Sequence, residues 1–151
     1  MQHEDFSLDK EGRKSKFICV DFDGTIVDHK FPDIGQESPG AFKWLRQFQN
    51  MDARIILFTM RSDEPTDMFG NILNRLVLTE AVKYIQSNGI NLYGINENPS
   101  QASWTSSPKA YGNVYIDDLA VGCPLIQPEG FYRKCVDWSI VGPMVESVIL
   151  T

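Results

Sequence analysis

Apolar residues follow two kinds of pattern along this chain: short continuous runs, and longer stretches in which they recur at helical spacing. The continuous runs are rich in β-forming residues, and their length is typical of strands buried on both faces of a parallel sheet. We predict that these runs form four strands, at residues 16–22, 53–59, 90–96 and 113–118.

Three stretches between and after these runs are predicted to form helices. The first covers residues 37–50, with Ser38 as its N-cap and a proline at the first helical position. The second covers residues 71–86 and is followed by Gly89, which is typical of a helix C-terminus. The third is expected from Pro143 to the end of the chain, where apolar residues again have helical spacing.

The alternation of strands and helices predicts the fold class. It is typical of an α/β protein with an open, doubly wound, mostly parallel sheet in a three-layer, Rossmann-like α/β/α arrangement. We expect one such domain over residues 16–151, preceded by a flexible lead-in at residues 1–15. The loops at residues 61–71 and 97–112 are long, and structureless loops of this length are often functional.

Composition and charge narrow the range of partners and compartments. The chain has 151 residues and a formal net charge of −6, which argues against nucleic acid as its main partner. No apolar run reaches the length of about 18 residues that spans a membrane. Three irregularly spaced cysteines favour a reducing compartment, the cytoplasm, over a disulfide framework. With two histidines and no Cys-x-x-Cys, the chain has too few of the usual zinc ligands.

Polar side chains follow three of the predicted strands, where each strand ends. They are Asp21 and Asp23, then Thr59 followed by Arg61, then Asp117 and Asp118. In a doubly wound sheet, ligands bind beyond the carboxyl ends of the strands. Four carboxylates at one edge repel one another unless a cation lies among them, and carboxylate ligands with positions left for water and phosphate are typical of Mg²⁺. The sequence therefore predicts a Mg²⁺ site at this edge.

The same strand ends resemble the motifs of one enzyme superfamily. DFDGT (21–25) resembles the first motif of the haloacid dehalogenase (HAD) superfamily, D-x-D-G-[TV], while IILFT (55–59) and VYIDD (114–118) resemble its second and fourth. The resemblance covers about residues 16–125, and it is closest to the small capless hydrolases of bacteria and their phages. It implies a Mg²⁺-dependent phosphatase that acts on a small phosphorylated substrate.

The resemblance also implies roles for the carboxylates. Asp21 is expected to attack phosphorus and become an aspartyl-phosphate, which divides one difficult displacement into two easier ones. Asp23 is expected to protonate the leaving alkoxide and then take a proton from the hydrolytic water. Mg²⁺ would be held by Asp21, the backbone carbonyl of Asp23, and Asp117, with Asp118 nearby or acting through water.

The remaining motif positions are expected to contact the substrate. Thr59 would donate a hydrogen bond to a phosphoryl oxygen, and a lysine would neutralise charge and fix the nucleophile. Two lysines are candidates for this third motif, Lys109 before the last predicted strand and Lys83 within a predicted helix; we favour Lys109. The expected substrate-binding residues are Gly24, Thr25, Thr59, Arg61 and Lys109.

Other functions are weighed against the phosphatase. A nucleotide kinase or GTPase is disfavoured because the chain has no G-x-x-x-x-G-K-[ST] loop. The strongest alternative is a non-catalytic phosphate- or metal-binding regulatory domain on the same fold. The segments between the motifs are too short for a cap domain, so the site should be open unless loop 31–37 or loop 61–71 closes over it. The identity of the substrate and the oligomeric state stay open.

Overall fold

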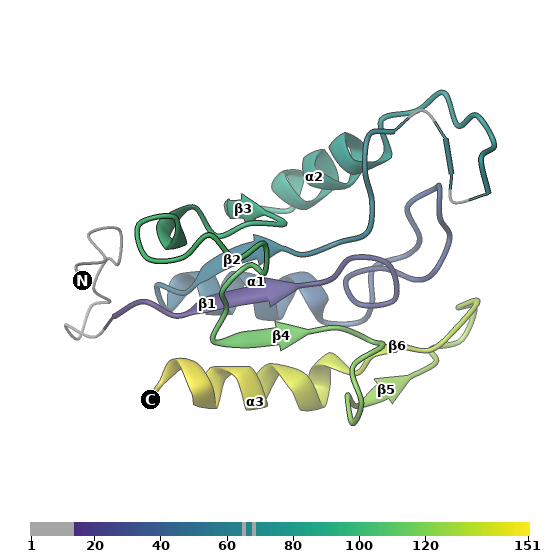
Figure 1. Ribbon diagram of the computed structural model, residues 1–151. Coiled ribbons are helices and arrows are strands. Elements are labelled where there is room, and N and C mark those ends of the chain that lie inside the picture. Colours follow the sequence, from purple (N-terminus) through teal and green to yellow (C-terminus); the bar gives the residue numbers. More distant parts are fainter. Residues whose placement is uncertain (1–13, 65, 68) are drawn as a thin grey trace.

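Four parallel strands form the central sheet of the computed structural model, which describes residues 14–64, 66–67 and 69–151 (Figure 1). In space the order is β3-β2-β1-β4. The strands are β1 (Phe17–Val20), β2 (Arg54–Leu57), β3 (Leu92–Ile95) and β4 (Val114–Ile116). All four predicted strands are confirmed, and each is shorter than its apolar run because the residues at both ends already belong to loops.

The register of the sheet aligns the ends of three strands. Val20, the last residue of β1, pairs with Leu57 of β2 on one side and with Ile116 of β4 on the other. Each of these partners is also the last residue of its own strand. The carboxyl ends of β1, β2 and β4 are therefore level, and the residues that follow them lie at one edge of the sheet.

Three helices cover one face of this sheet: α1 (Ala41–Asn50), α2 (Val77–Ser87) and α3 (Trp138–Ile149). Figure 1 shows α1 behind the strands, with α2 and α3 on either side of it. The side chains of Ile18 and Val20 point from β1 into the main core, which the buried residues of the three helices complete. Because side chains alternate along a strand, the neighbouring residues of β1 face the opposite side.

The second face of the sheet is covered by the segment that joins β3 to β4. Phe17 and Cys19 of β1 pack there with Ala110 and the ring of Tyr111. This segment contains only a short 3₁₀ helix, η1 (Pro99–Gln101), where an α-helix would be usual. The predicted parallel α/β fold with three layers is confirmed, and its third layer is largely irregular chain.

The starts of the helices differ from the prediction for local reasons. Ser38 does not cap α1, because Gly40 has a left-handed backbone (φ 83°) and the helix begins after it. Helix α2 begins at Val77 rather than at residue 71, since Asn74 also has a positive φ, of 56°. Helix α3 begins before Pro143, which lies inside it: Asp137 caps the helix by accepting a hydrogen bond from the N–H of Ser139. Gly89 follows α2 with φ 85°, as expected for a residue that ends a helix.

An antiparallel pair of short strands was not predicted. Strands β5 (Leu125–Ile126) and β6 (Cys135–Val136) pair beside the loop that follows β1. The buried carboxylate of Asp28 anchors their connection by accepting a hydrogen bond from the N–H of Tyr132 at 2.7 Å. Each of these strands is only two residues long, which is too short for a periodic pattern to reveal it.

The ends of the chain complete the description. Residues 1–13 of the predicted lead-in lie outside the described residues, and Ser15 is already buried against the domain. Among the helices of the described chain, none combines the length and apolar character needed to cross a membrane.

Candidate functional site

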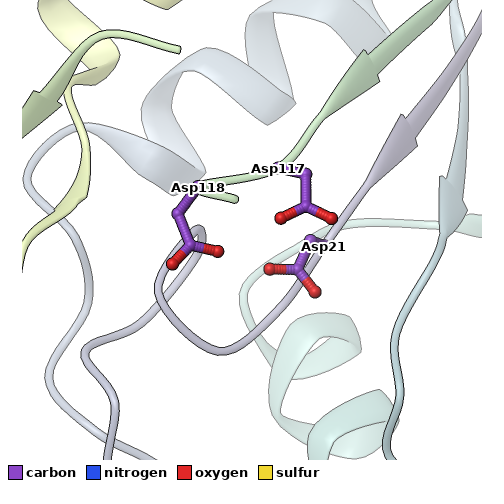
Figure 2. A group of neighbouring side chains, drawn as sticks. All are labelled: Asp21, Asp117 and Asp118. Atoms are coloured by element: carbon purple, nitrogen blue, oxygen red, sulfur yellow. The ribbon is translucent and has the colours of Figure 1, made fainter. Parts of the chain in front are cut away.

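Three carboxylates meet at the level carboxyl ends of β1 and β4. Asp21 follows β1 directly, and its N–H donates a hydrogen bond to the carbonyl of Ile116 at 2.9 Å, which ties it to the end of β4. Asp117 and Asp118 are the two residues that follow β4. One oxygen from each carboxylate lies within 4.8 Å of the other two, and Figure 2 shows the three side chains turned toward one another.

The electrostatics of this acidic cluster are unfavourable without a cation. Burial, followed by the charge of Asp117, raises the pKa of Asp21 to about 8, and the charge of Asp118 adds to this increase. Within the described part of the chain, no lysine or arginine forms an ion pair with these carboxylates. The donor set consists of oxygen atoms on carboxylates, which suits a hard divalent cation. The residues therefore fit a metal ion of this class.

Thr25 holds the two sides of the cluster together. Its hydroxyl donates a hydrogen bond to Oδ2 of Asp21 at 2.9 Å and accepts one from the N–H of Asp118 at 3.2 Å. The residue is fully buried, so this side chain faces the interior and not an approaching substrate. The sequence interpretation assigned Thr25 to substrate binding, which stays a prediction; in the structure its hydroxyl connects Asp21 with Asp118.

His29 is a site residue that the sequence interpretation missed. Its Nε2 lies 2.9 Å from Oδ2 of Asp118. The backbone of Gly24 passes directly beside this pair: its φ is 84°, and a Cβ there would overlap both the His29 ring and the Asp118 carboxylate. Gly24 thus leaves room for the contact between His29 and Asp118. A histidine in the same loop as DFDGT was the available signal.

Asp23 does not belong to the acidic cluster; its carboxylate is bound by Arg61. The guanidinium donates from Nε to Oδ2 at 2.8 Å and from Nη2 to Oδ1 at 2.9 Å, a two-point ion pair. Its remaining donors reach the carbonyls of Pro32, Asp33 and Val77. All five N–H donors of Arg61 are therefore used, whereas the sequence interpretation expected this side chain to bind phosphate.

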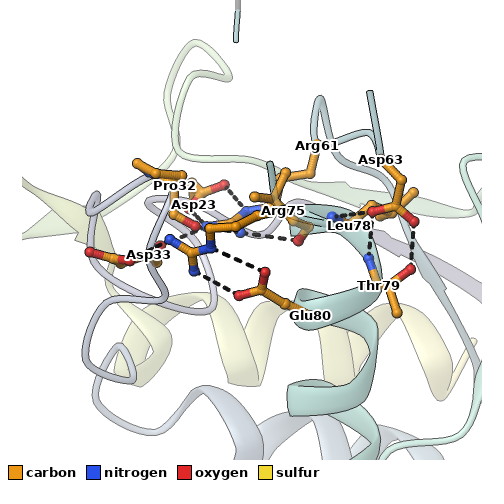
Figure 3. A network of polar contacts seen from close by, with 10 residues as sticks. Asp23, Pro32, Asp33, Arg61, Asp63, Arg75, Leu78, Thr79 and Glu80 are labelled. Atoms are coloured by element: carbon orange, nitrogen blue, oxygen red, sulfur yellow. Dashed lines mark hydrogen bonds and ion pairs between the residues drawn. The ribbon is translucent and has the colours of Figure 1, made fainter. Parts of the chain in front are cut away.

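The polar contacts around Arg61 extend to the start of α2 (Figure 3). The carboxylate of Asp63 accepts hydrogen bonds from the N–H groups of Leu78 and Thr79, which caps the helix from a distant segment. Arg75 forms ion pairs with Asp33 and Glu80 at 2.7 Å each. The contacts link parts of loops 31–37 and 61–71, the segments suggested as lids, to the first turn of α2.

The comparisons with known proteins give one informative result. A solved structure of a conserved protein coded by a locus from Bacteroides thetaiotaomicron is 31% identical to this chain, with a TM-score of 0.65. The alignment covers 88% of this chain and 91% of that protein. This chain belongs to the family of that Bacteroides protein. No family model matches the sequence, and no curated protein matches it either.

In this member of the Bacteroides protein's family, Thr59 lies at the predicted edge. Its N–H donates to the side chain of Asn96 at 2.8 Å, and its hydroxyl oxygen accepts from the N–H of Arg61 at 3.1 Å. Among the residues that the structure describes, its hydroxyl hydrogen has no acceptor. Thr59 thus closes the turn after β2, and its hydroxyl group lies next to the backbone of Arg61.

The two candidate lysines lie on different sides of the sheet. Lys109 is exposed, and its Nζ lies 5.3 Å from the centroid of the Tyr115 ring, on the face covered by the segment between β3 and β4. Lys83 is exposed on α2, which covers the other face. Neither forms an ion pair with the acidic cluster in the described chain. The identity of the third-motif lysine stays a prediction.

Proposed function

We propose that this chain is a Mg²⁺-dependent phosphatase of the HAD superfamily that hydrolyses small phosphomonoesters through an aspartyl-phosphate on Asp21. The observation that carries the proposal is the meeting of Asp21, Asp117 and Asp118, with oxygens within 4.8 Å of one another. DFDGT and VYIDD supply these three residues and IILFT supplies Thr59, in the order of the superfamily's motifs. All of them follow strands whose carboxyl ends are level.

The proposed reaction has two displacements at phosphorus. In the first, an oxygen of Asp21 forms a bond to phosphorus while the bond to the leaving oxygen breaks, and Asp23 gives its proton to that oxygen. In the second, water attacks phosphorus, the bond to Asp21 breaks, and Asp23 takes the proton of the water. Inorganic phosphate is released, and both carboxyl groups return to their first state.

The surrounding residues prepare Asp21 for this reaction. Thr25 holds its carboxylate through the hydrogen bond to Oδ2, and Thr59 is proposed to donate its hydroxyl hydrogen to a phosphoryl oxygen. Mg²⁺ held by Asp21, Asp117 and Asp118 would neutralise the charge that separates a carboxylate from a phosphate dianion. Lys109 is the proposed further cation. Comparing the phosphatase activities of Lys109→Ala and Lys83→Ala identifies which of the two is the third-motif lysine.

The proposed site is open, because the chain between the motif residues is too short to contain a cap domain. Helix α1 lies in the segment between Thr25 and Thr59, and the next segment, from Arg61 to Lys109, contains α2, β3 and the short helix η1. The net charge of −6 disfavours a polyanion such as a nucleic acid. Three free cysteines are consistent with a reducing compartment, so the cytoplasm is the proposed location.

The test is hydrolysis of p-nitrophenyl phosphate and a panel of small phosphate esters, with and without Mg²⁺. Wild-type protein should turn over only with the metal, and Asp21→Asn should lower kcat by about 10⁴-fold because the nucleophile is gone. Asp33→Asn is the matched control: it removes an exposed carboxylate that pairs with Arg75, away from the cluster.

Two results would overturn the proposal in different ways. Metal-dependent turnover that survives in Asp21→Asn would refute the nucleophile. Tight Mg²⁺ binding without turnover of any ester would instead favour a regulatory domain that binds metal or phosphate.

A further inference from the structure

We propose that Arg61 is a positioning residue that sets the place of Asp23 and does not bind the substrate phosphate. The inference rests on the proposed function, in which Asp23 carries the proton. It starts from the two-point ion pair, with N–O distances of 2.8 and 2.9 Å between the guanidinium and the two oxygens of Asp23. A pair of this geometry fixes both the position and the rotation of a carboxylate.

The guanidinium is itself fixed by contacts on every donor. Three backbone carbonyls, of Pro32, Asp33 and Val77, accept its other hydrogen bonds at 2.8 to 3.2 Å. The rings of Phe22 and Phe31 lie with centroids 4.9 and 5.1 Å from its central carbon. The Arg61 side chain is 1% exposed, whereas that of Asp23 is 20% exposed. The partner that faces outward is therefore the carboxylate.

This distribution of contacts separates two roles that an arginine after the second motif could have. An arginine that binds phosphate needs free donors and access to the ligand, and Arg61 has neither. An arginine that orients a carboxylate needs rigid support on its remaining donors, and Arg61 has three carbonyl supports from two other segments of the chain. Each oxygen of Asp23 keeps a second lone pair, which is the position available to a transferred proton.

The contacts also require arginine at this position. Lysine keeps the positive charge but has three donors around a single nitrogen, so it cannot hold both oxygens of Asp23 and the three carbonyls together. Arg61→Lys should therefore leave the carboxyl group of Asp23 present but displaced. Displacement of a proton carrier by about 1 Å can cost about 100-fold in rate.

The experiment compares two leaving groups in wild type, Arg61→Lys, Asp23→Asn and the double variant. An alkyl phosphate needs a proton on its leaving oxygen, whereas p-nitrophenolate leaves without one. For the alkyl phosphate, Arg61→Lys should lower kcat by about 100-fold. With p-nitrophenyl phosphate, the initial burst of nitrophenolate should keep its rate while steady-state turnover slows, because only the second displacement then needs Asp23.

The double variant decides between positioning and substrate binding. If Arg61 acts through Asp23, adding Arg61→Lys to Asp23→Asn should change kcat by less than about threefold. If Arg61 binds phosphate, the two effects should multiply and KM should rise for both substrates, which would overturn the inference. Arg75→Lys is the matched control, since Arg75 lies in the same network but does not contact Asp23.

A second variant covers the case in which Arg61→Lys does not fold, as judged by circular dichroism. Phe31 is 45% exposed, so Phe31→Leu should fold, and it removes one ring that packs on the guanidinium. It should slow alkyl phosphates more than the nitrophenolate burst; equal slowing of both would contradict the inference. Absence of Mg²⁺-dependent turnover in wild type would instead refute the proposed function, so the two failures are distinguishable.

Discussion

Asp21 and Asp23 are two residues apart in one loop, yet only Asp23 has a basic partner among the described residues. Asp21 lies among like charges, and burial together with Asp117 raises its pKa to about 8. Asp23 has an arginine on both of its oxygens. The second carboxylate is neutralised by the protein itself, and the first is not. Of the two carboxylate regions, the cluster around Asp21 is therefore the one whose charge suits a cation.

The side chains that contact the two carboxylate regions differ in the same way. A hydroxyl and an imidazole hold the acidic cluster: Thr25 contacts Asp21, and His29 contacts Asp118. The Asp23 region has Arg61 and, further out, Arg75, each bound to acidic partners. Removal of an acidic side chain should therefore have different consequences on the two sides.

The largest effect is expected from removing a ligand of the cluster. Asp117→Asn should weaken Mg²⁺ binding, measured by titration calorimetry, by more than about 100-fold, since even indirect partners of metal ligands are worth about 10- to 100-fold. Asp33→Asn should bind Mg²⁺ like wild type, because Asp33 forms an ion pair with Arg75 and does not belong to the acidic cluster. Equal Mg²⁺ affinity in Asp117→Asn and wild type would remove the distinction between the two regions.

An effect of a few kcal/mol is expected in the stability of the metal-free protein as a function of pH. The pKa of Asp21 is raised from 3.8 to about 8, so folding favours its protonated form. The stability that this provides is fully present below about pH 4 and is lost as the pH rises through about 8. Thermal unfolding of wild type should thus move to lower temperature over this range relative to Asp21→Asn.

Mg²⁺ provides the control for this pH dependence. A bound cation stabilises the ionised carboxylate, so saturating Mg²⁺ should remove the difference in slope between wild type and Asp21→Asn above pH 7. A metal-free wild type whose unfolding temperature follows that of Asp21→Asn from pH 4 to pH 9 would contradict the account of the cluster.

The two regions also differ in how far the sequence alone revealed them. Asp21 and Asp117 each follow an apolar run, and the ends of neighbouring parallel strands lie at one edge, so strand order was enough to bring them together. The placement of Arg61 against Asp23 depends on three carbonyls from two other segments of the chain, and His29 contacts Asp118 across 89 positions. Such contacts are made by loops whose paths depend on tertiary packing and leave no periodic pattern.

Helix starts were missed for a related reason. The Ser38-Pro sequence has the composition of an N-terminus, but the left-handed conformation of Gly40 delays α1. Helix α2 is capped by Asp63, which lies well before it in the chain, so no residue at its start carried the usual signal. The strands of a buried sheet can be predicted from their own apolar residues, whereas a helix cap that comes from a distant segment cannot be predicted from the sequence around the helix start.

An effect of about tenfold is expected from the indirect support of the cluster. His29→Ala should weaken Mg²⁺ binding by about 10-fold because Asp118 loses the contact that orients it. His29→Gln retains a donor near Oδ2 and should recover most of the affinity. Lys30→Ala, at the exposed neighbouring position, is the control. Wild-type affinity in His29→Ala would show that Thr25 and the backbone orient the cluster unaided.

The smallest effect is expected at the far end of the Arg61 network, where Asp63 caps α2. Asp63→Ala should lower the unfolding temperature by a few degrees and leave Mg²⁺ affinity unchanged, because the cap is remote from the cluster. Hydrogen bonds from Thr79 lower the pKa of Asp63, so its stabilisation is present at neutral pH and is lost as the pH falls through that lowered pKa. The difference from wild type should therefore shrink in acid, whereas Glu64→Ala should show no such difference. A loss of Mg²⁺ affinity in Asp63→Ala would mean that the two carboxylate regions are coupled through the start of α2 and are not independent.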